Sequence, residues 1–322
     1  MMTIQIDIFS GFFGAGKTTL IKKLINEKVY SKKVTLIENE FGEIPIDGTF
    51  LKKFNIEIKE IKAGCICCST VNDFNDTLKE IIDSRETERI IIEPSGVGKL
   101  SEIVKIVKKL EADNDVNLNL VIAAVDVTMY EEFINLFSEF YEDQVIHAST
   151  VILSRTQSAT AEELQLVVSK IREINENARI ITTPWDDLSG VELFGLSEAD
   201  GKKEAIIHNL GEIDLSEHHH DHDHDDDLES DHNHDIFSSW GIETPKIFPI
   251  DVLKSIFNGL KDEDIYGKVV RSKGKVQVDD NRWVEFDFVP KQFEIRESEP
   301  DQVGRITVIG HDLNKEKLET AF

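Results

Sequence analysis

The first 187 residues alternate short apolar runs with longer stretches whose apolar residues recur every three or four positions. The short runs predict β-strands, and several of them are apolar without a break, as expected for strands covered on both faces. The longer stretches predict amphipathic helices. The predicted strands are residues 4–9, 34–37, 89–93, 118–126, 150–154 and 179–182, and the predicted helices are residues 18–27, 71–82, 100–110, 129–140 and 161–175.

The alternation of strands and helices implies βαβ units, and therefore an α/β fold built on a mainly parallel sheet. One run differs from the others. Residues 3–9 alternate between polar and apolar side chains, which is less typical of a strand in the middle of a parallel sheet.

The C-terminal part of the chain predicts a smaller α+β domain. The segment "PIDVLKSIFNGL", residues 249–260, places its apolar residues on one face of a helix. Residues 265–278 predict two strands with a turn near Lys273 and Gly274. Residues 282–289 and 305–310 predict two further strands, and residues 313–322 predict a closing helix.

Between these two parts lies a low-complexity segment that includes "EHHHDHDHDDDLESDHNHD". Like charges at this density cannot bury enough apolar surface to offset the entropy of ordering, so we expect a disordered linker when no metal is bound. Interleaved histidine and aspartate collect divalent cations through imidazole and carboxylate, and a solvated spacer is the alternative. The candidate metal-binding residues are His218, His219, His220, His222 and His224, followed by His232 and His234.

The net charge of −26 disfavours partners that are themselves anionic, such as nucleic acid or an acidic membrane surface, and suits cations. No stretch approaches the roughly 18 apolar residues of a membrane helix, and the N-terminus lacks the features of a signal peptide. All three cysteines lie between positions 65 and 68, which is a poor disulfide framework. We therefore expect a cytoplasmic protein with free thiols.

The segment "GFFGAGKT", residues 11–18, fits the phosphate-binding pattern G-x-x-x-x-G-K-[ST] between a predicted strand and a predicted helix. Glycines let backbone amides curl around phosphates, and the helix N-terminus adds partial positive charge. We expect Lys17 to reach the β- and γ-phosphates and Thr18 to bind Mg²⁺. The candidate nucleotide-binding residues of this segment are Gly11, Gly14, Ala15, Gly16, Lys17, Thr18 and Thr19.

A carboxylate at the end of another strand is expected to face the Mg²⁺ ion. Glu93 follows three isoleucines in "RIIIEPSG" and is the preferred candidate, so that Lys17 and Glu93 are the candidate catalytic residues. Asp126, at the end of "VIAAVD", is the alternative. The isoleucines before Glu93 place it at the rim of the sheet, where ligands collect, and a solvated charge at the end of a strand is the alternative.

The segment "GCICC", residues 64–68, gathers every cysteine of the chain. Thiolates bind borderline and soft cations such as Zn²⁺, Co²⁺ or Cu⁺, so Cys65, Cys67 and Cys68 are candidate metal ligands. In an extended chain Cys68 points away from the other two, so either a bend gathers all three or two of them bind. Buried inert cysteines and a redox or nucleophilic role are the alternatives. The candidate fourth ligands are water and the carboxylates of "ENEFGE", namely Glu38, Glu40 and Glu43.

With the phosphate loop, "ENEFGEIPID", "GCICC", "EPSG" and "GHDLNKEKLETAF" in this order, the chain resembles the CobW-like family of P-loop GTPases and metallochaperones. Members of this family are related to the GTPases that deliver nickel to urease and hydrogenase. The resemblance implies a P-loop GTPase domain in residues 1–187, a linker in residues 188–239 and a CobW-type C-terminal domain in residues 240–322. It also implies that the cysteine site responds to bound nucleotide, that "ENEFGE" senses the γ-phosphate, and that Glu93 is the family's strand-end acidic residue.

One segment departs from the family pattern. Where these GTPases usually carry N-K-x-D, this chain has Ser154, Arg155, Thr156 and Gln157. The aspartate that accepts two hydrogen bonds from guanine is missing, and a glutamine oxygen can replace it only in part. Ser154, Arg155 and Gln157 are the candidate base-binding residues, with Arg155 able to stack on a base, and a relaxed choice of nucleotide is the alternative to guanine preference.

These features lead to the hypothesis of a nucleotide-gated metal carrier. Mg²⁺ and GTP would order the segment around Glu40 and complete the thiolate site, and hydrolysis would release zinc, or alternatively cobalt, to a client metalloprotein. Slow intrinsic hydrolysis is expected because the sequence supplies no assignable arginine finger. The rival hypotheses are a metal storage or sensing protein and a nucleotide-dependent activase of a corrinoid or other cofactor enzyme.

Overall fold

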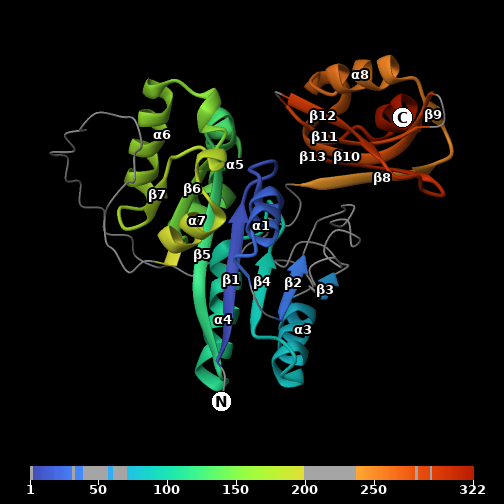
Figure 1. Cartoon of the computed structure of the whole chain (residues 1–322). Helices are drawn as coiled ribbons and strands as arrows, with labels where there is room; N and C mark the ends of the chain where they lie inside the picture. Colours follow the sequence, from blue (N-terminus) through green and yellow to red (C-terminus); the bar gives the residue numbers. More distant parts are fainter. Residues whose placement is uncertain are drawn as a thin grey trace.

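The computed structural model describes residues 3–30, 33–38, 57–60, 71–198, 237–279, 282–290 and 292–322. An α/β domain is followed by a smaller domain with an antiparallel sheet (Figure 1). The predicted fold class is therefore confirmed. The predicted metal ligands Glu40, Glu43, Cys65, Cys67, Cys68 and the histidines between His218 and His234 lie outside the described residues.

Within the described residues, the sheet of the first domain has seven strands, and every neighbouring pair is parallel. The strand order is β3-β2-β4-β1-β5-β6-β7, which places β1 in the middle. Strand β3 was not predicted, because its sequence "EIKE" has a single apolar residue. The strands are β1 (Ile4–Gly11), β2 (Val34–Glu38), β3 (Glu57–Glu60), β4 (Arg89–Glu93), β5 (Val116–Asp126), β6 (Thr150–Ser154) and β7 (Arg179–Ile181).

Helices cover both faces of this sheet, and each face has its own apolar core. One core is formed with α3 (Val71–Ser84), α4 (Leu100–Asp113), α5 (Tyr130–Ile146) and α6 (Ala161–Ile174). The other is formed with α1 (Lys17–Asn26) and α7 (Gly190–Glu198). Helix α7 and part of strand β8 (Ser238–Thr244) lie in the range that the sequence assigns to a linker.

The polar residues that alternate along β1 have partners in the neighbouring strands. Asp7 is fully buried, and its carboxylate accepts hydrogen bonds from Arg89 on β4, at 2.5 Å, and from Asn119 on β5, at 2.9 Å. Gln5 accepts a hydrogen bond from Asn117 at 2.8 Å. A central strand can therefore carry polar residues here, because its two neighbours supply charged and amide partners.

The C-terminal domain has an antiparallel sheet in the order β12-β11-β10-β13-β8, with β9 paired to β10. Its helices α8 (Ile250–Gly259) and α10 (Lys315–Ala321) pack their apolar residues on one face of the sheet, and the short α9 (Glu263–Tyr266) precedes β10. The strands besides β8 are β9 (Ile247–Phe248), β10 (Lys268–Val278), β11 (Trp283–Val289), β12 (Gln292–Ser298) and β13 (Gly304–His311).

The prediction of two strands that turn near Lys273 and Gly274 is wrong, because residues 268–278 form one continuous strand, β10. Gly274 lies inside this strand and serves a close approach rather than a turn. A Cβ atom on Gly274 would lie 2.4 Å from the ring of Phe286 and 2.7 Å from the carbonyl oxygen of Arg305. A glycine within a strand often marks such a contact.

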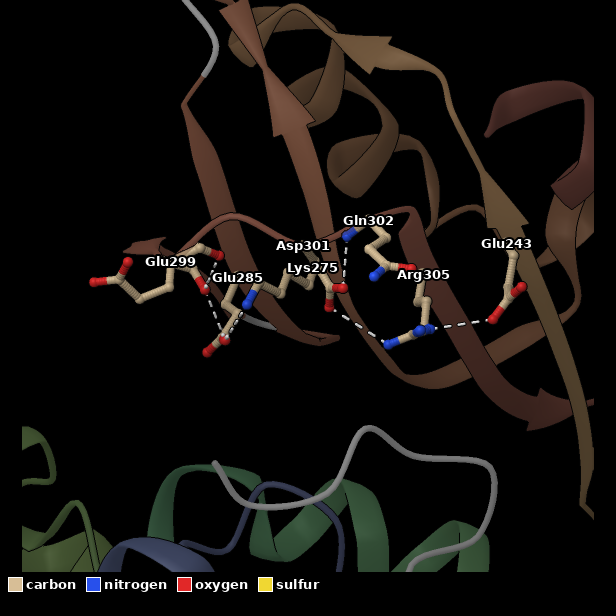
Figure 2. A network of polar contacts seen from close by, with 8 residues as sticks. Glu243, Lys275, Glu285, Glu299, Asp301, Gln302 and Arg305 are labelled. Carbon is tan, nitrogen blue, oxygen red and sulfur yellow. Dashed lines mark hydrogen bonds and ion pairs between the residues drawn. The ribbon is translucent and has the colours of Figure 1, made fainter. Parts of the chain in front are cut away.

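The other face of the C-terminal sheet carries charged residues, which form ion pairs between neighbouring strands (Figure 2). Arg305 on β13 lies between Asp301, at 3.4 Å, and Glu243 on β8, at 3.1 Å. Lys275 on β10 lies 4.0 Å from Glu285 on β11. Alternation of apolar and charged residues is typical of an antiparallel sheet with one face packed on helices.

The C-terminal domain lies at the end of the parallel sheet toward which the strand arrows point (Figure 1). Val270 on β10 and Ile309 on β13 belong to the same buried apolar cluster as Phe12 and Phe13, which follow β1. The two domains therefore share part of one core.

We predict that Asp7→Ala lowers the free energy of unfolding by about 3 kcal/mol, because it leaves the largely buried cation of Arg89 without its carboxylate. The side chains of Arg89 and Asp7 are 20% and 0% exposed. Urea unfolding of the full-length chain measures this loss.

The matched control is Asp115→Ala, which breaks the exposed pair of Arg85 and Asp115, whose side chains are 56% and 46% exposed. Its cost should be about 0.5 kcal/mol or less. Equal losses in the two variants would contradict a stabilising role for the buried pair.

Candidate functional site

The carboxyl ends of five strands meet at one edge of the parallel sheet and carry the residues that the sequence singles out. This edge is where open parallel sheets bind their ligands, next to the point at which the strand order reverses. The residues that end these strands are Gly11 on β1, Glu38 on β2, Glu93 on β4, Asp126 on β5 and Ser154 on β6.

The loop between β1 and α1 has a backbone that requires glycine. The φ angles are +141° at Gly11, +70° at Gly14 and +96° at Gly16. Residues other than glycine rarely adopt such angles. A Cβ atom on Gly11 would lie 2.4 Å from the carbonyl oxygen of Ala124 on β5. The loop therefore curls tightly against β5 before α1 begins at Lys17.

Lys17, the first residue of α1, lies against this loop and is 6% exposed. Its ammonium group donates hydrogen bonds to the carbonyl oxygens of Gly11, at 2.8 Å, and Phe12, at 3.3 Å. A buried cation at the N-terminus of a helix, within a glycine-rich loop, fits the phosphates of a nucleotide.

Thr18 contacts Glu93, which is the preferred magnesium ligand of the sequence analysis. The Thr18 hydroxyl lies 2.6 Å from the carboxylate of Glu93, which is 1% exposed. Glu38, 3% exposed, is the register partner of Glu93 in the adjacent strand. A hydroxyl and carboxylate oxygens are the hard ligands that Mg²⁺ prefers, so these residues fit that ion.

Asp126, the alternative candidate, is held in a different arrangement. It accepts hydrogen bonds from the backbone and hydroxyl of Thr128, at 3.0 and 2.8 Å, and it pairs with Arg155. Asp126 therefore orders the segment that follows β5.

Arg155 connects Asp126 to the phosphate loop. Its guanidinium group donates to the carbonyl oxygen of Gly14 at 2.9 Å as well as to Asp126, and its own backbone is left-handed, with φ of 57°. The sequence suggests that Arg155 can stack on a base, and it does not predict this contact. One cation here links β5, the end of β6 and the loop.

The sequence also singled out Ser154, which ends β6, and Gln157, which follows it. Ser154 is buried, whereas Gln157 is exposed in the short turn η2 (Thr156–Ser158). Trp185 was not singled out from the sequence. Its ring lies 2.9 Å from the position of a Cβ atom on Gly16, and its indole N–H donates to the carbonyl oxygen of Leu153 at 2.9 Å. Its position just after a strand of the parallel sheet was the available signal.

The predicted Thr19 is exposed on α1, and Ala15 is buried in the loop. Lys22, further along the same helix, lies close to the C-terminal sheet. Burial lowers the pKa of Lys22, and the positive charges of Lys273 and Arg296 lower it further. The carboxylates of Glu38 and Glu285 act on Lys22 in the opposite direction, so charges of both signs surround this residue.

In the part of the chain that the structure describes, no group of three or more His, Cys, Asp or Glu residues could hold a metal ion. Glu38, at the end of β2, is one of the predicted carboxylate ligands and lies within this part. Among the helices of the described residues, none is long and apolar enough to cross a membrane.

Comparison with known proteins identifies both domains. The family model "CobW/HypB/UreG, nucleotide-binding domain" matches residues 5–182, and the model "Cobalamin synthesis protein cobW C-terminal domain" matches residues 237–322.

Individual relatives carry names that refer to zinc. The zinc chaperone YjiA of Escherichia coli K12 is 32% identical over 200 residues, which are 60% of this chain and 62% of YjiA. The chain thus spans less than two thirds of that relative. The zinc-regulated GTPase metalloprotein activator 1 of Schizosaccharomyces pombe is 25% identical over 91% of this chain and 76% of its own length. The crystal structure of Zn(II)-bound YjiA GTPase from E. coli is 23% identical, covers 100% of this chain and 98% of its own, and has a TM-score of 0.47.

We predict that Thr18→Val weakens Mg²⁺-dependent nucleotide binding by about tenfold or more, because the hydroxyl that contacts Glu93 is lost while the shape of the side chain is kept. Titration with a fluorescent GTP analogue, with and without Mg²⁺, measures this effect. Thr19→Val makes the same change at the exposed neighbouring position and should leave the affinity as it is. A Mg²⁺ response in Thr18→Val equal to that of the native chain would exclude the assigned role.

We predict that Arg155→Ala weakens binding of GTP and ATP analogues by the same factor, because it removes a partner of the Gly14 carbonyl rather than a contact to the base. The ratio of the two affinities, measured by competition, should therefore stay within about twofold of the native value. A large change in that ratio would instead assign base selection to Arg155.

Proposed function

The chain belongs to the CobW/HypB/UreG family of nucleotide-binding proteins, and on this premise we propose that it is a nucleotide-gated metal carrier that hydrolyses GTP. Its cargo is a divalent metal, zinc in the first place, and it delivers this metal to a client metalloprotein. The single observation that supports the proposal most is that Glu38 on β2 lies beside Glu93 on β4, its register partner, at the carboxyl ends of these strands. Glu93 contacts the magnesium candidate Thr18, and Glu38 begins the segment that carries the predicted γ-phosphate sensor.

In this proposal the residues of the loop bind and orient the nucleotide. Lys17 neutralises charge on the β- and γ-phosphates, and the backbone amides between Gly11 and Thr18 hold the remaining phosphate oxygens. Thr18 and Glu93 hold Mg²⁺, which when bound neutralises charge that develops during phosphoryl transfer. Arg155 fixes the loop through Gly14, so that these groups are in place before nucleotide arrives.

The covalent chain keeps the predicted cargo ligands near this site. Glu40 follows the end of β2 by two positions, and Cys65 follows the end of β3 by five. An extended residue spans at most about 3.6 Å, so two residues reach at most about 7 Å beyond Glu38, and five residues reach at most about 18 Å beyond Glu60. Glu38 and Glu60 are themselves register partners. This supports a metal site, formed by Cys65, Cys67, Cys68 and Glu40, beside the γ-phosphate.

The chemistry of the ligands and the names of the relatives both favour zinc. Thiolate and imidazole suit Zn²⁺, and the same ligands accept Co²⁺. The relatives from E. coli and S. pombe are named for zinc. The histidines from His218 to His224 would collect the metal and pass it to the cysteine site. Free thiols at that site fit the reducing cytoplasm.

We predict that the protein binds Zn²⁺ about tenfold more tightly with Mg²⁺ and a non-hydrolysable GTP analogue than with Mg²⁺ and GDP. Such a ratio corresponds to roughly 1.4 kcal/mol of coupling, and it requires Zn²⁺ to raise the affinity for the GTP analogue relative to the affinity for GDP by the same factor. Anaerobic competition with a chromophoric chelator measures the metal affinity in both states.

The control is a variant in which Cys65, Cys67 and Cys68 are replaced by Ser. It should lose the nucleotide-dependent site and keep the weaker sites of the histidine segment. Equal zinc affinities in the two nucleotide states would contradict a carrier and favour metal storage. A cysteine variant that still supports its client in the cell would favour an activase instead.

A further inference from the structure

Two residues of the phosphate loop carry large apolar side chains that are almost completely buried. Phe12 and Phe13 occupy variable positions of the loop pattern, and each is 1% exposed. The ring of Phe12 lies 4.7 Å from that of Phe133 and 5.2 Å from that of Phe137, both on α5. The side of the loop that faces away from the nucleotide is therefore anchored in an aromatic cluster. We define this cluster as Phe12, Phe13, Phe133, Phe137, Phe140, Tyr141 and Phe237.

Phe237 enters the aromatic cluster from the C-terminal domain, one residue before β8. Its ring centroid lies 4.9 Å from that of Phe137 and 5.7 Å from that of Phe140. Phe237 also lies close to the two loop residues. Its ring centroid is 6.2 Å from that of Phe13 and 6.4 Å from that of Phe12. The C-terminal domain thus contacts side chains of the phosphate loop directly.

Further contacts connect the same parts. A Cβ atom on Gly14 would lie 2.8 Å from the side chain of Val289 on β11, so the C-terminal sheet lies against the loop backbone. Phe13 packs on Gly96, where a Cβ atom would lie 2.6 Å from its ring. Gly96 follows Glu93 by three positions, so Phe13 connects the loop to the segment that follows Glu93.

Helix α5 is interrupted at the residue that lies between the two domains. Phe137 has φ and ψ angles of −137° and 36°, which are not helical, and its ring contacts both Phe12 and Phe237. Side-chain packing around Phe137 and the path of the helix backbone are therefore coupled at this point.

We propose that Phe237 is a positioning residue for the phosphate loop, through which the C-terminal domain sets the affinity for nucleotide. It acts by holding Phe12 and Phe13, and with them the backbone that presents Lys17 and Thr18. This inference rests on the nucleotide-binding part of the proposed function and is independent of the cargo metal. By reciprocity, nucleotide bound at the loop must strengthen the contact between the two domains.

The test compares three full-length variants with the native chain, using a fluorescent GTP analogue and Mg²⁺. Phe237→Ala should raise the dissociation constant for the analogue about fivefold to tenfold. This factor corresponds to the interaction energy of an aromatic pair of side chains. Phe237→Leu, which keeps most of the apolar volume, should stay within about twofold of the native value. Phe293→Ala is the matched control, because Phe293 is a partly buried phenylalanine of the same domain that packs on Phe257. It should leave the affinity unchanged.

An unchanged dissociation constant in Phe237→Ala would overturn the inference, and so would an equal loss in Phe293→Ala. Failure of the native chain to bind the analogue would count against the proposed function instead. Hydrogen exchange of the native chain gives a second readout that needs no variant. Amides of β10 and β13 should exchange more slowly when the analogue is bound, and equal exchange rates would contradict coupling of the domains.

Discussion

The left-handed glycine backbone of the phosphate loop is the constraint on which the remaining structure depends. Gly11 ends the central strand, and its lack of a side chain allows β1 to lie against the carbonyl of Ala124. The turn that follows starts α1 at Lys17, so that the ammonium group and the helix N-terminus face the same space. The neighbouring strands then deliver Glu93 and Asp126 to this edge, one for the Thr18 hydroxyl and the other for Arg155.

Two buried carboxylates of this strongly acidic protein are paired with cations. At the opposite end of the sheet Asp7 is buried together with the cation of Arg89, and at the functional edge Asp126 is buried together with Arg155. Each of these two carboxylates therefore has a cation on an adjacent strand or loop, which offsets the cost of removing it from water. The charged face of the C-terminal sheet also has ion pairs (Figure 2). These pairs contribute less to the free energy of unfolding, because their side chains are more exposed.

The parts of the fold that could be predicted are those encoded by neighbouring residues. The apolar runs and helical periods identified most elements of the α/β domain, and consecutive residues identified the phosphate loop. The parts that could not be predicted depend on distant contacts. Gly274 stays within a strand because of the ring of Phe286, Arg155 reaches Gly14 across 141 positions, and Trp185 meets Gly16 only in the folded chain. The contact of Thr18 with Glu93 could be predicted in part. The sequence motifs specify the two chemical groups, and the order of the strands in the sheet brings them together.

The hydrogen bonds that Lys17 donates to the carbonyl oxygens of Gly11 and Phe12 have a consequence for selectivity. An anion that binds Lys17 competes with two acceptors that the loop itself supplies. Chloride or free inorganic phosphate offers few compensating contacts, whereas a polyphosphate chain would also engage the backbone amides and a Mg²⁺ ion held by Thr18 and Glu93. In the proposed function the loop would therefore discriminate against simple anions by providing its own competitor for the lysine.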